Sequence, residues 1–192
     1  MRIIYRLVSA IDALLRAWPH AMGGCYLRFF VWKQRFAYCG RGVLLGDRIT
    51  ITGFPAIRIG EGTQFMSGSY LYADESSNLY FGSNCSFNHN VFLGACGGEI
   101  IIGNEVLIGP NVVLRAADHL FARVDISIRS QGHRPGRIVI GDDVWLAANV
   151  VVTSGVTIGN GCVVGAGSIV TRDLPPMSLC VGNPAQPIRS RL

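Results

Sequence analysis

Histidine is the side chain best suited to take up and release a proton near neutral pH, and this chain of 192 residues contains four. His119 and His133 both lie in a polar segment that runs from Arg115 to Arg137. The other charged residues inside this segment are Asp118, Arg123, Asp125, Arg129 and Arg134. The two histidines are either candidates for general acid–base chemistry or ordinary solvated loop residues. The position of this segment relative to the predicted secondary structure distinguishes the two interpretations.

Those elements are set by a repeat of six residues. From Ile140 to Val170 every sixth residue is isoleucine, leucine or valine, and a small or β-branched residue follows four places after each of the first five. A period of six fits neither an α-helix nor a single alternating strand. It is typical of short strands joined by tight corners, three to each coil, and it predicts an all-β parallel β-helix. The leading positions are Ile140, Leu146, Val152, Ile158, Val164 and Val170.

The same register occurs upstream and is interrupted twice. Residues 94–99 add three residues to one block, and residues 115–137 form the polar segment. Coils of a β-helix stack about 4.8 Å apart, so a long insertion cannot be absorbed and must protrude as a loop. Loops of this length in compact domains are usually functional or disordered. We therefore expect a β-helix over residues 43–174 with loop 115–137, and a C-terminal tail over residues 175–192.

The first 42 residues differ in kind from the repeats. Apolar residues recur at spacings of three and four from Ile3 to Trp18, which predicts an amphipathic helix ending at Pro19. Residues 26–33 then combine aromatic and basic side chains. Such an extension either caps the open end of the β-helix, packs between subunits, or makes peripheral contact with a membrane. Polar residues interrupt the apolar runs, so neither a membrane span nor a cleavable signal peptide is expected.

Composition restricts the remaining classes. Charged residues make up 15% of the chain, and its net charge of +5 is compatible with an anionic cofactor or a membrane surface. The arginines are dispersed, which argues against binding of nucleic acid. The six cysteines form no CxxC pair, so we expect no metal site. Cys85 and Cys162 occupy the small-residue position of the repeat, where buried thiols in a reducing compartment are expected.

The repeat and the order of its motifs resemble the hexapeptide-repeat acyltransferases over roughly residues 43–190. The closest likeness is to the sugar O-acetyltransferases, a branch that includes maltose, galactoside and cell-surface polysaccharide acetyltransferases. It is densest in residues 138–145, 155–159, 164–173 and 181–185. The resemblance implies a left-handed β-helix, a homotrimer, and transfer of an acetyl group from acetyl-CoA to a sugar hydroxyl in polysaccharide biosynthesis. The expected location is the cytoplasm, or the inner membrane face if the N-terminal helix binds lipid.

The resemblance also implies roles for individual residues. The family's catalytic histidine follows the coil before the long loop, as His119 does here, and it passes the proton of the attacking hydroxyl to the departing thiolate. His133 is expected to be structural or to contact the acceptor. The backbone N–H of Ala148 corresponds to the donor that stabilises the oxyanion. Asn88 and Trp145 correspond to acceptor-binding residues; the alternatives are an ordinary corner asparagine and a core tryptophan.

Acetyl-CoA is expected in a groove between two subunits. The small side chains of Ala148 and Ala166 would allow its pantetheine arm to approach closely. Thr171, Arg172 and Arg189 match positions near the nucleotide phosphates in the family, and a guanidinium suits phosphate geometry. Surface solubility is the alternative explanation for both arginines.

The sequence departs from the family pattern in two places. Residues 94–98 replace an aspartate pair near the acceptor site, and Gln186 stands where relatives carry a basic residue. Three other functions therefore stay open. The chain could be an N-acetyltransferase acting on a nucleotide-linked amino sugar, or a non-catalytic scaffold. It could also be a zinc lyase of the γ-carbonic anhydrase type. Such an enzyme binds zinc through three histidines, whereas only His89 and His119 are plausible ligands in this chain.

Overall fold

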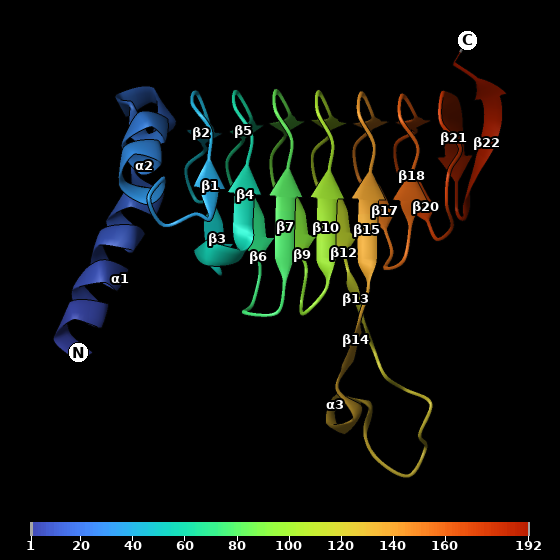
Figure 1. Cartoon of the computed structure of the whole chain (residues 1–192), viewed down its shortest axis with the longest axis horizontal. Helices are drawn as coiled ribbons and strands as arrows, with labels where there is room; N and C mark the ends of the chain where they lie inside the picture. Colours follow the sequence, from blue (N-terminus) through green and yellow to red (C-terminus); the bar gives the residue numbers. More distant parts are fainter. Residues whose placement is uncertain (1, 192) are drawn as a thin grey trace.

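The computed structural model describes residues 2–191, with side chains from Ala10 onward, and its body is the parallel β-helix that the repeat predicts (Figure 1). The first sheet contains β1 (Tyr38–Cys39), β4 (Ile57–Ile59), β7 (Asn78–Phe81), β10 (Glu99–Ile102), β15 (Arg137–Ile140) and β18 (Thr157–Ile158). The second contains β2 (Leu44–Leu45), β5 (Gln64–Phe65), β8 (Ser86–Phe87), β11 (Leu107–Ile108), β16 (Trp145–Leu146), β19 (Val163–Val164), β21 (Ser178–Gly182) and β22 (Ala185–Ser190). The third contains β3 (Thr50–Thr52), β6 (Tyr70–Tyr72), β9 (Phe92–Gly94), β12 (Val113–Arg115), β17 (Val151–Val152) and β20 (Ile169–Val170). A short 3-10 helix, η2 (Phe54–Ala56), lies between β3 and β4.

The six-residue register sets how the coils stack. Each leading aliphatic residue lies beside its counterpart one coil away, and these side chains are fully buried in one continuous core. The register continues across the long insertion, because β10, β11 and β12 before it pair in parallel with β15, β16 and β17 after it. The fold predicted from the sequence is confirmed. Stacked pairs include Ile102–Ile140, Ile108–Leu146, Leu114–Val152, Ile140–Ile158, Leu146–Val164 and Val152–Val170.

The corners of successive coils are locked together. Gly82 lies at the corner between the first and second sheets. A Cβ there would lie 2.3 Å from the carbonyl oxygen of Gly103, so this position has room for glycine alone. At the corner between the second and third sheets, Asn90, Asn111 and Asn149 adopt left-handed φ values of 58°, 58° and 60°. Their side-chain amides form a ladder, with donor–acceptor distances of 3.3 Å and 3.1 Å. Asparagine tolerates this backbone conformation well, so the ladder fixes the corner without strain.

The insertion and the tail depart from the coils. Between β12 and β15 the chain forms β13 (Ala117–His119), α3 (Ile128–Gln131) and β14 (His133–Pro135), and this segment projects from the prism (Figure 1). β13 and β14 pair antiparallel. In the tail, β21 joins the second sheet and β22 folds back antiparallel upon it. The sequence indicated a protruding loop and a tail but not these strands.

The N-terminal segment covers the opposite end of the prism. We call α1 (Arg2–Ala17), η1 (His20–Met22) and α2 (Gly24–Trp32) the N-terminal cap; it stands beside the first coil, with α2 against β2 (Figure 1). The predicted apolar residues 3–8 of the amphipathic helix fall outside the described side chains. Trp32, the last residue of α2, is buried, and its Nε1 donates to Asp12 Oδ1 of α1 at 2.9 Å.

A buried arginine fastens the cap to the first coil. Arg28 Nε donates to the Leu45 carbonyl at 2.7 Å, and Nη1 donates to the carbonyls of Leu15 and Trp18, each at 2.7 Å. Burial lowers the pKa of the Arg28 guanidinium, and the nearby Asp47 carboxylate partly opposes this. The group stays charged at neutral pH, so three carbonyls from two elements share one buried cation.

Replacing Arg28 by methionine should therefore loosen the cap. We expect the free energy of unfolding to fall by about 3 kcal/mol, because the carbonyls of Leu15, Trp18 and Leu45 lose a charged donor. Urea unfolding followed by circular dichroism measures the change. The matched control is Arg41→Met, since the Arg41 side chain is 91% exposed and its pair with Glu61 contributes little. Equal stabilities for the two variants would contradict this role of Arg28.

Candidate active site

The two loop histidines meet on the short ladder that leaves the prism. His119 is the last residue of β13 and lies opposite His133 of β14. Their ring centroids are 4.0 Å apart and the planes meet at 40°. Beyond them, Leu120 N donates to the Gly132 carbonyl at 3.0 Å, which closes the ladder. The sequence places both residues in the loop but does not predict this contact, because the pairing of β13 with β14 has no counterpart in the repeat.

A hollow of about 390 Å³ opens beside His119. Its volume lies within the range of small-molecule sites. The Phe121 ring on its wall is 72% exposed. One imidazole thus stands at the edge of a largely apolar hollow, where a bound hydroxyl could reach it. The lining residues are Asp118, His119, Leu120, Phe121, Ala122 and Arg134.

The rest of the loop is held by its own polar contacts. Gln131 Nε2 donates to the Arg123 carbonyl at 2.8 Å, while Arg123 N donates to Gln131 Oε1 at 3.0 Å. Arg123 also forms an ion pair with Asp125, which lowers the pKa of that carboxyl. Ser127 caps α3 by accepting a hydrogen bond from Ser130 N at 3.2 Å. These contacts give the wall of the hollow a defined position even though the loop projects from the prism.

Aromatic rings lie on the outer surface of β6 and β9 in the third sheet, the sheet from which β13 departs. The rings of Tyr70 and Phe92 are stacked at 5.3 Å with planes 4° apart, and Tyr72 stacks beside Tyr70 at 6.4 Å. We call these three residues the aromatic ladder. The aromatic ladder was not predicted from the sequence, although the positions of its residues in the repeat give one signal. Tyr70, Tyr72 and Phe92 each stand next to a leading residue of the register, Leu71 or Leu93, at positions that point outward.

A row of polar groups connects the aromatic ladder to the loop. Tyr72, Gly94 and Arg115 are neighbours across β6, β9 and β12. The Arg115 guanidinium lies over Gly94, with Nη1 3.7 Å from where a Cβ would stand. The pKa of the Tyr72 hydroxyl is raised, first by the Cys96 thiol and then by burial and by Asp74, while Arg115 acts in the opposite direction. Arg115 is the last residue of β12, so this row leads directly into β13.

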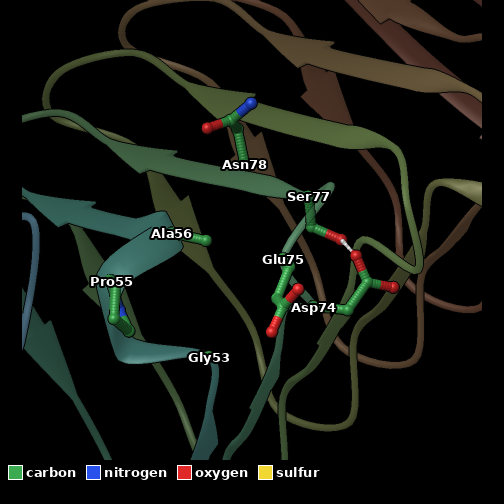
Figure 2. A pocket seen from close by; sticks show the side chains of 7 residues that line it. All are labelled: Gly53, Pro55, Ala56, Asp74, Glu75, Ser77 and Asn78. Carbon is green, nitrogen blue, oxygen red and sulfur yellow. Dashed lines mark hydrogen bonds between the residues drawn. The ribbon is translucent and has the colours of Figure 1, made fainter.

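A second hollow, of about 460 Å³, lies on the coils between the cap and the loop. Figure 2 shows Asp74 turned toward Ser77, with Glu75 between Asp74 and Pro55. Asp74 Oδ1 accepts hydrogen bonds from Ser77 Oγ at 2.7 Å and from Ser76 N at 3.1 Å, which lowers the pKa of that carboxyl. Two carboxylates make this hollow unsuitable for a phosphate group. Gly53, Ala56 and Asn78 complete its lining.

Comparison with known proteins decides the family. The Escherichia coli protein WcaF, which carries the name of a colanic acid biosynthesis acetyltransferase, is 33% identical over 170 residues, or 85% of this chain and 81% of WcaF. The model of the bacterial transferase hexapeptide family (six repeats) matches residues 137–172. The chain belongs to the hexapeptide-repeat acetyltransferases.

Other members of the family are similar over shorter stretches or in their structures. A solved hexapeptide-repeat acetyltransferase from Vibrio cholerae, complexed with acetyl-CoA, has a TM-score of 0.61 and 30% identity, covering 86% of this chain and 76% of that one. Galactoside O-acetyltransferase from E. coli is 39% identical over 120 residues, which are 62% of this chain and 57% of that protein. The chain spans just over half the length of the first curated relatives that it matches, between 55% and 59% of each.

Trp145 and Asn88, the two residues predicted from the sequence to bind the acceptor, are both exposed. Trp145 is 49% exposed on the outer surface of β16, beside Leu107, so the interpretation as a core tryptophan is wrong. Asn88 follows β8 at the corner between the second and third sheets, and its Oδ1 accepts a hydrogen bond from His89 N at 2.7 Å. Both side chains can therefore be reached by a ligand, but from different parts of the prism.

Ala148 lies at the same corner as Asn88, farther from the cap. Its neighbours are bonded to adjacent coils, Ala147 N to the Val164 carbonyl and Asn149 N to the Pro110 carbonyl, each at 2.9 Å. The Ala148 N–H meets no acceptor among the residues that the structure describes. Ala166 is exposed on the next coil, where Gly167 N donates to the Ala148 carbonyl at 2.9 Å. The structure thus brings Ala148 and Ala166 together beside an unused backbone donor.

The structure does not bring His119 and Ala148 together within one chain. His119 stands at the corner where the third sheet leads into the first, whereas Ala148 stands where the second leads into the third. The other residues matched to the cofactor are also dispersed and exposed: Thr171 and Arg172 follow β20, and Arg189 lies on β22. In residues 2–191, no three His, Cys, Asp or Glu side chains are grouped to hold a metal ion.

Proposed function

We propose that this chain transfers the acetyl group of acetyl-CoA to a hydroxyl group of a sugar, in the biosynthesis of a cell-surface polysaccharide. The observation that carries the proposal is the position of His119 at the edge of a hollow, on an ordered ladder outside the prism. The names of WcaF and of the acetyl-CoA-bound relative support the reaction and the donor.

His119 is proposed as the general base. An alcohol is protonated at neutral pH, so its oxygen attacks a carbonyl readily only when a base removes the proton at the same time. Acetyl-CoA supplies the acetyl group as a thioester. His119 then passes the proton to the departing sulfur, so that the ester and a free thiol are formed and the imidazole is regenerated. His133, with its ring centroid 4.0 Å from that of His119, is proposed to hold the His119 ring in place.

Ala148 and Ala166 fit the role of a cofactor-binding corner. The unused N–H of Ala148 can donate to the oxygen that becomes negative when the carbonyl is attacked, and a backbone donor costs no reorganisation. The small side chains of both residues let a narrow chain such as pantetheine lie against the backbone. Thr171, Arg172 and Arg189 are proposed to face the phosphates, since their side chains are exposed and guanidinium groups bind phosphate well.

The separation of His119 and Ala148 supports a homotrimer. One chain presents the base at the corner between the third and first sheets and the oxyanion donor at the corner between the second and third sheets. A complete site therefore needs the His119 corner of one copy and the Ala148 corner of its neighbour. Contacts between two different corners are heterologous and close into a ring, and a three-sided prism suits three copies. In this arrangement Trp145 lies on the sheet beside the donor corner.

The acceptor is proposed to lie along the third sheet. In the proposed trimer, the copy that supplies His119 also presents the aromatic ladder, and Asn88, which shares the corner of Ala148, comes from the neighbouring copy. Aromatic walls with a few polar groups are typical of sites that bind small polar molecules. Residues 94–98, which lack the aspartate pair of the galactoside-type enzymes, lie at the same edge as His119, so the acceptor is expected to be a different sugar.

Removing the base should abolish turnover. We expect His119→Asn to lower the rate of acceptor-dependent thiol release from acetyl-CoA by about two to four orders of magnitude, because asparagine keeps the polarity but cannot take the proton. The acceptor panel should contain sugars and amino sugars, which separates O-transfer from N-transfer. His20→Asn, an exposed histidine of the cap, is the control and should match the wild type. If His119→Asn releases thiol at the wild-type rate, the mechanism is wrong. If the wild type uses none of the acceptors, the result favours the non-catalytic scaffold.

Mixing two inactive variants should restore activity. Ala148→Pro removes the proposed oxyanion donor, and since that N–H has no partner in the chain, the coil loses no hydrogen bond. Equal amounts of His119→Asn and Ala148→Pro are unfolded together and reassembled. About a quarter of the interfaces should then combine an intact His119 from one copy with an intact Ala148 N–H from its neighbour, so about a quarter of wild-type activity should return. Matching mass and circular dichroism confirm that each variant assembles. If both groups acted within one chain, mixing would restore nothing.

Shortening the aromatic ladder should affect the acceptor rather than the donor. We expect Phe92→Ala to raise the KM for the sugar by up to about tenfold, since stacking on an aromatic ring contributes roughly 0.5–1.5 kcal/mol. The KM for acetyl-CoA should change less than twofold. Tyr80→Ala is the control, because Tyr80 is 50% exposed on the first sheet, away from the ladder. A change confined to acetyl-CoA would contradict the placement of the acceptor.

A further inference from the structure

The N-terminal cap presents a strongly apolar surface. Eight large hydrophobic side chains between Ile11 and Val31 are exposed, and three of them, Leu14, Tyr26 and Phe30, are exposed by 69%, 68% and 71%. We call the eight residues the cap surface. Isolated exposed hydrophobic residues are ordinary, but a group of this size on two adjacent helices marks a binding surface. Its members are Ile11, Leu14, Trp18, Met22, Tyr26, Leu27, Phe30 and Val31.

Capping the prism does not account for these residues. On α2, Cys25, Arg28 and Trp32 are buried toward the first coil, whereas Tyr26 and Phe30 recur four residues apart on the other side. On α1, Leu15 is buried while Ile11 and Leu14 are exposed, and the exposed Trp18 directly after the helix continues their stripe at helical spacing. Trp18 Nε1 donates to the Met22 carbonyl at 3.2 Å and so joins the end of α1 to η1. Each helix thus has one apolar side for the core and a second that is left exposed.

Residues 1–42, which include the cap, carry all of the chain's net positive charge. Residues 1–42 contain seven Lys and Arg and one Asp, a net charge of +6, whereas residues 43–192 contain ten Lys and Arg and eleven Asp and Glu, a net charge of −1. Arg35, which follows the cap, pairs with Asp12 of α1. Lys33 lies over the rings of Phe29 and Phe30, 5.6 Å from each centroid, which places an ammonium group beside the most exposed aromatic side chain of the cap.

We propose that the cap surface docks onto the headgroup region of an anionic phospholipid bilayer. Tryptophan, tyrosine and phenylalanine beside leucine, isoleucine and lysine suit the boundary between headgroups and acyl chains, where the rings are buried and the cations stay with the phosphates. The net charge of +6 on residues 1–42 complements the negative surface potential of such a membrane. Over the described residues, no helix is long and apolar enough to cross a bilayer, so the contact is peripheral.

A lipid surface fits the charge better than a second copy of the chain does. Two cap surfaces packed against each other would bring two segments of net charge +6 together with Asp12 as the one acidic residue in each. That repulsion opposes association, whereas an anionic bilayer turns the same charge into attraction. This surface does not depend on the proposed transferase activity, since neither His119 nor Ala148 belongs to the cap.

Cosedimentation of the full chain with vesicles tests the proposal. The probes are vesicles of phosphatidylcholine alone and of phosphatidylcholine mixed with phosphatidylglycerol. We expect at least tenfold stronger binding to the anionic vesicles, weakened by salt. Phe30→Ser should weaken that binding about tenfold through loss of the buried ring, and Lys33→Gln about fivefold through loss of one charge. Their matched controls, Tyr80→Ser and Arg58→Gln, alter exposed residues of the first sheet and should change it less than twofold.

The outcomes separate the possible occupants. Equal binding by Phe30→Ser and the wild type, or no preference for anionic vesicles, would overturn the proposal. If sedimentation without lipid shows that Phe30→Ser lowers the mass of the assembly, the surface is an interface between copies and the proposal is also overturned. Thiol release with a soluble acceptor should be unchanged in Phe30→Ser, so a failure of membrane binding and a failure of the proposed enzyme are distinguished.

Discussion

Stacking of one coil upon the next is the constraint on which the rest of the structure depends. Each leading aliphatic residue must lie over its counterpart, about 4.8 Å away, for the core to close. The pairs Leu114–Val152 and Ile102–Ile140 keep this register although the loop lies between their members. Apart from Ala116 at its start, the insertion adds no side chain to the core, so its own ladder and polar contacts must stabilise it. His119 owes its exposed, ordered position to this separation.

The same stacking leaves an open end that needs a cover. Unpaired strand edges at the ends of a β-helix would otherwise invite association. At one end β22 folds back on β21 in an antiparallel backbone ladder. At the other end a helical cap is joined through Arg28, whose burial is unfavourable unless its charge is shared. A helix over a strand edge cannot continue the ladder, so a side chain has to reach the backbone of the coil, and a guanidinium offers enough donors to do so.

The sequence predicted the features that depend on the six-residue period. It did not predict the features that depend on contacts between segments outside the repeat. Register, core and loop followed from spacing, and the prediction of buried Cys85 and Cys162 is confirmed; burial raises the pKa of the Cys162 thiol to about 11. The aromatic ladder was missed because outward positions of the repeat tolerate any residue type, so no period marks them. The contact of His119 with His133 depends on a hairpin outside the repeat. Amphipathic spacing identified the N-terminal helix but not its partner, since one apolar face suits a coil, a subunit or a lipid surface equally well.

The separation of charge along the prism gives the proposed trimer an orientation. A three-fold axis parallel to the prism would place all three cap surfaces at the same end, so the copies could engage one bilayer together, and weak contacts would add up through high effective concentration. β12, which leads to His119, is the fourth strand of the third sheet from the cap, roughly 14 Å along the axis from the first strand. The thickness of a helix, about 10 Å, adds to that distance. An acceptor attached to lipid would thus have to extend about 25 Å beyond the headgroups to reach His119, which favours a glycan whose acetylated sugar lies away from its lipid end.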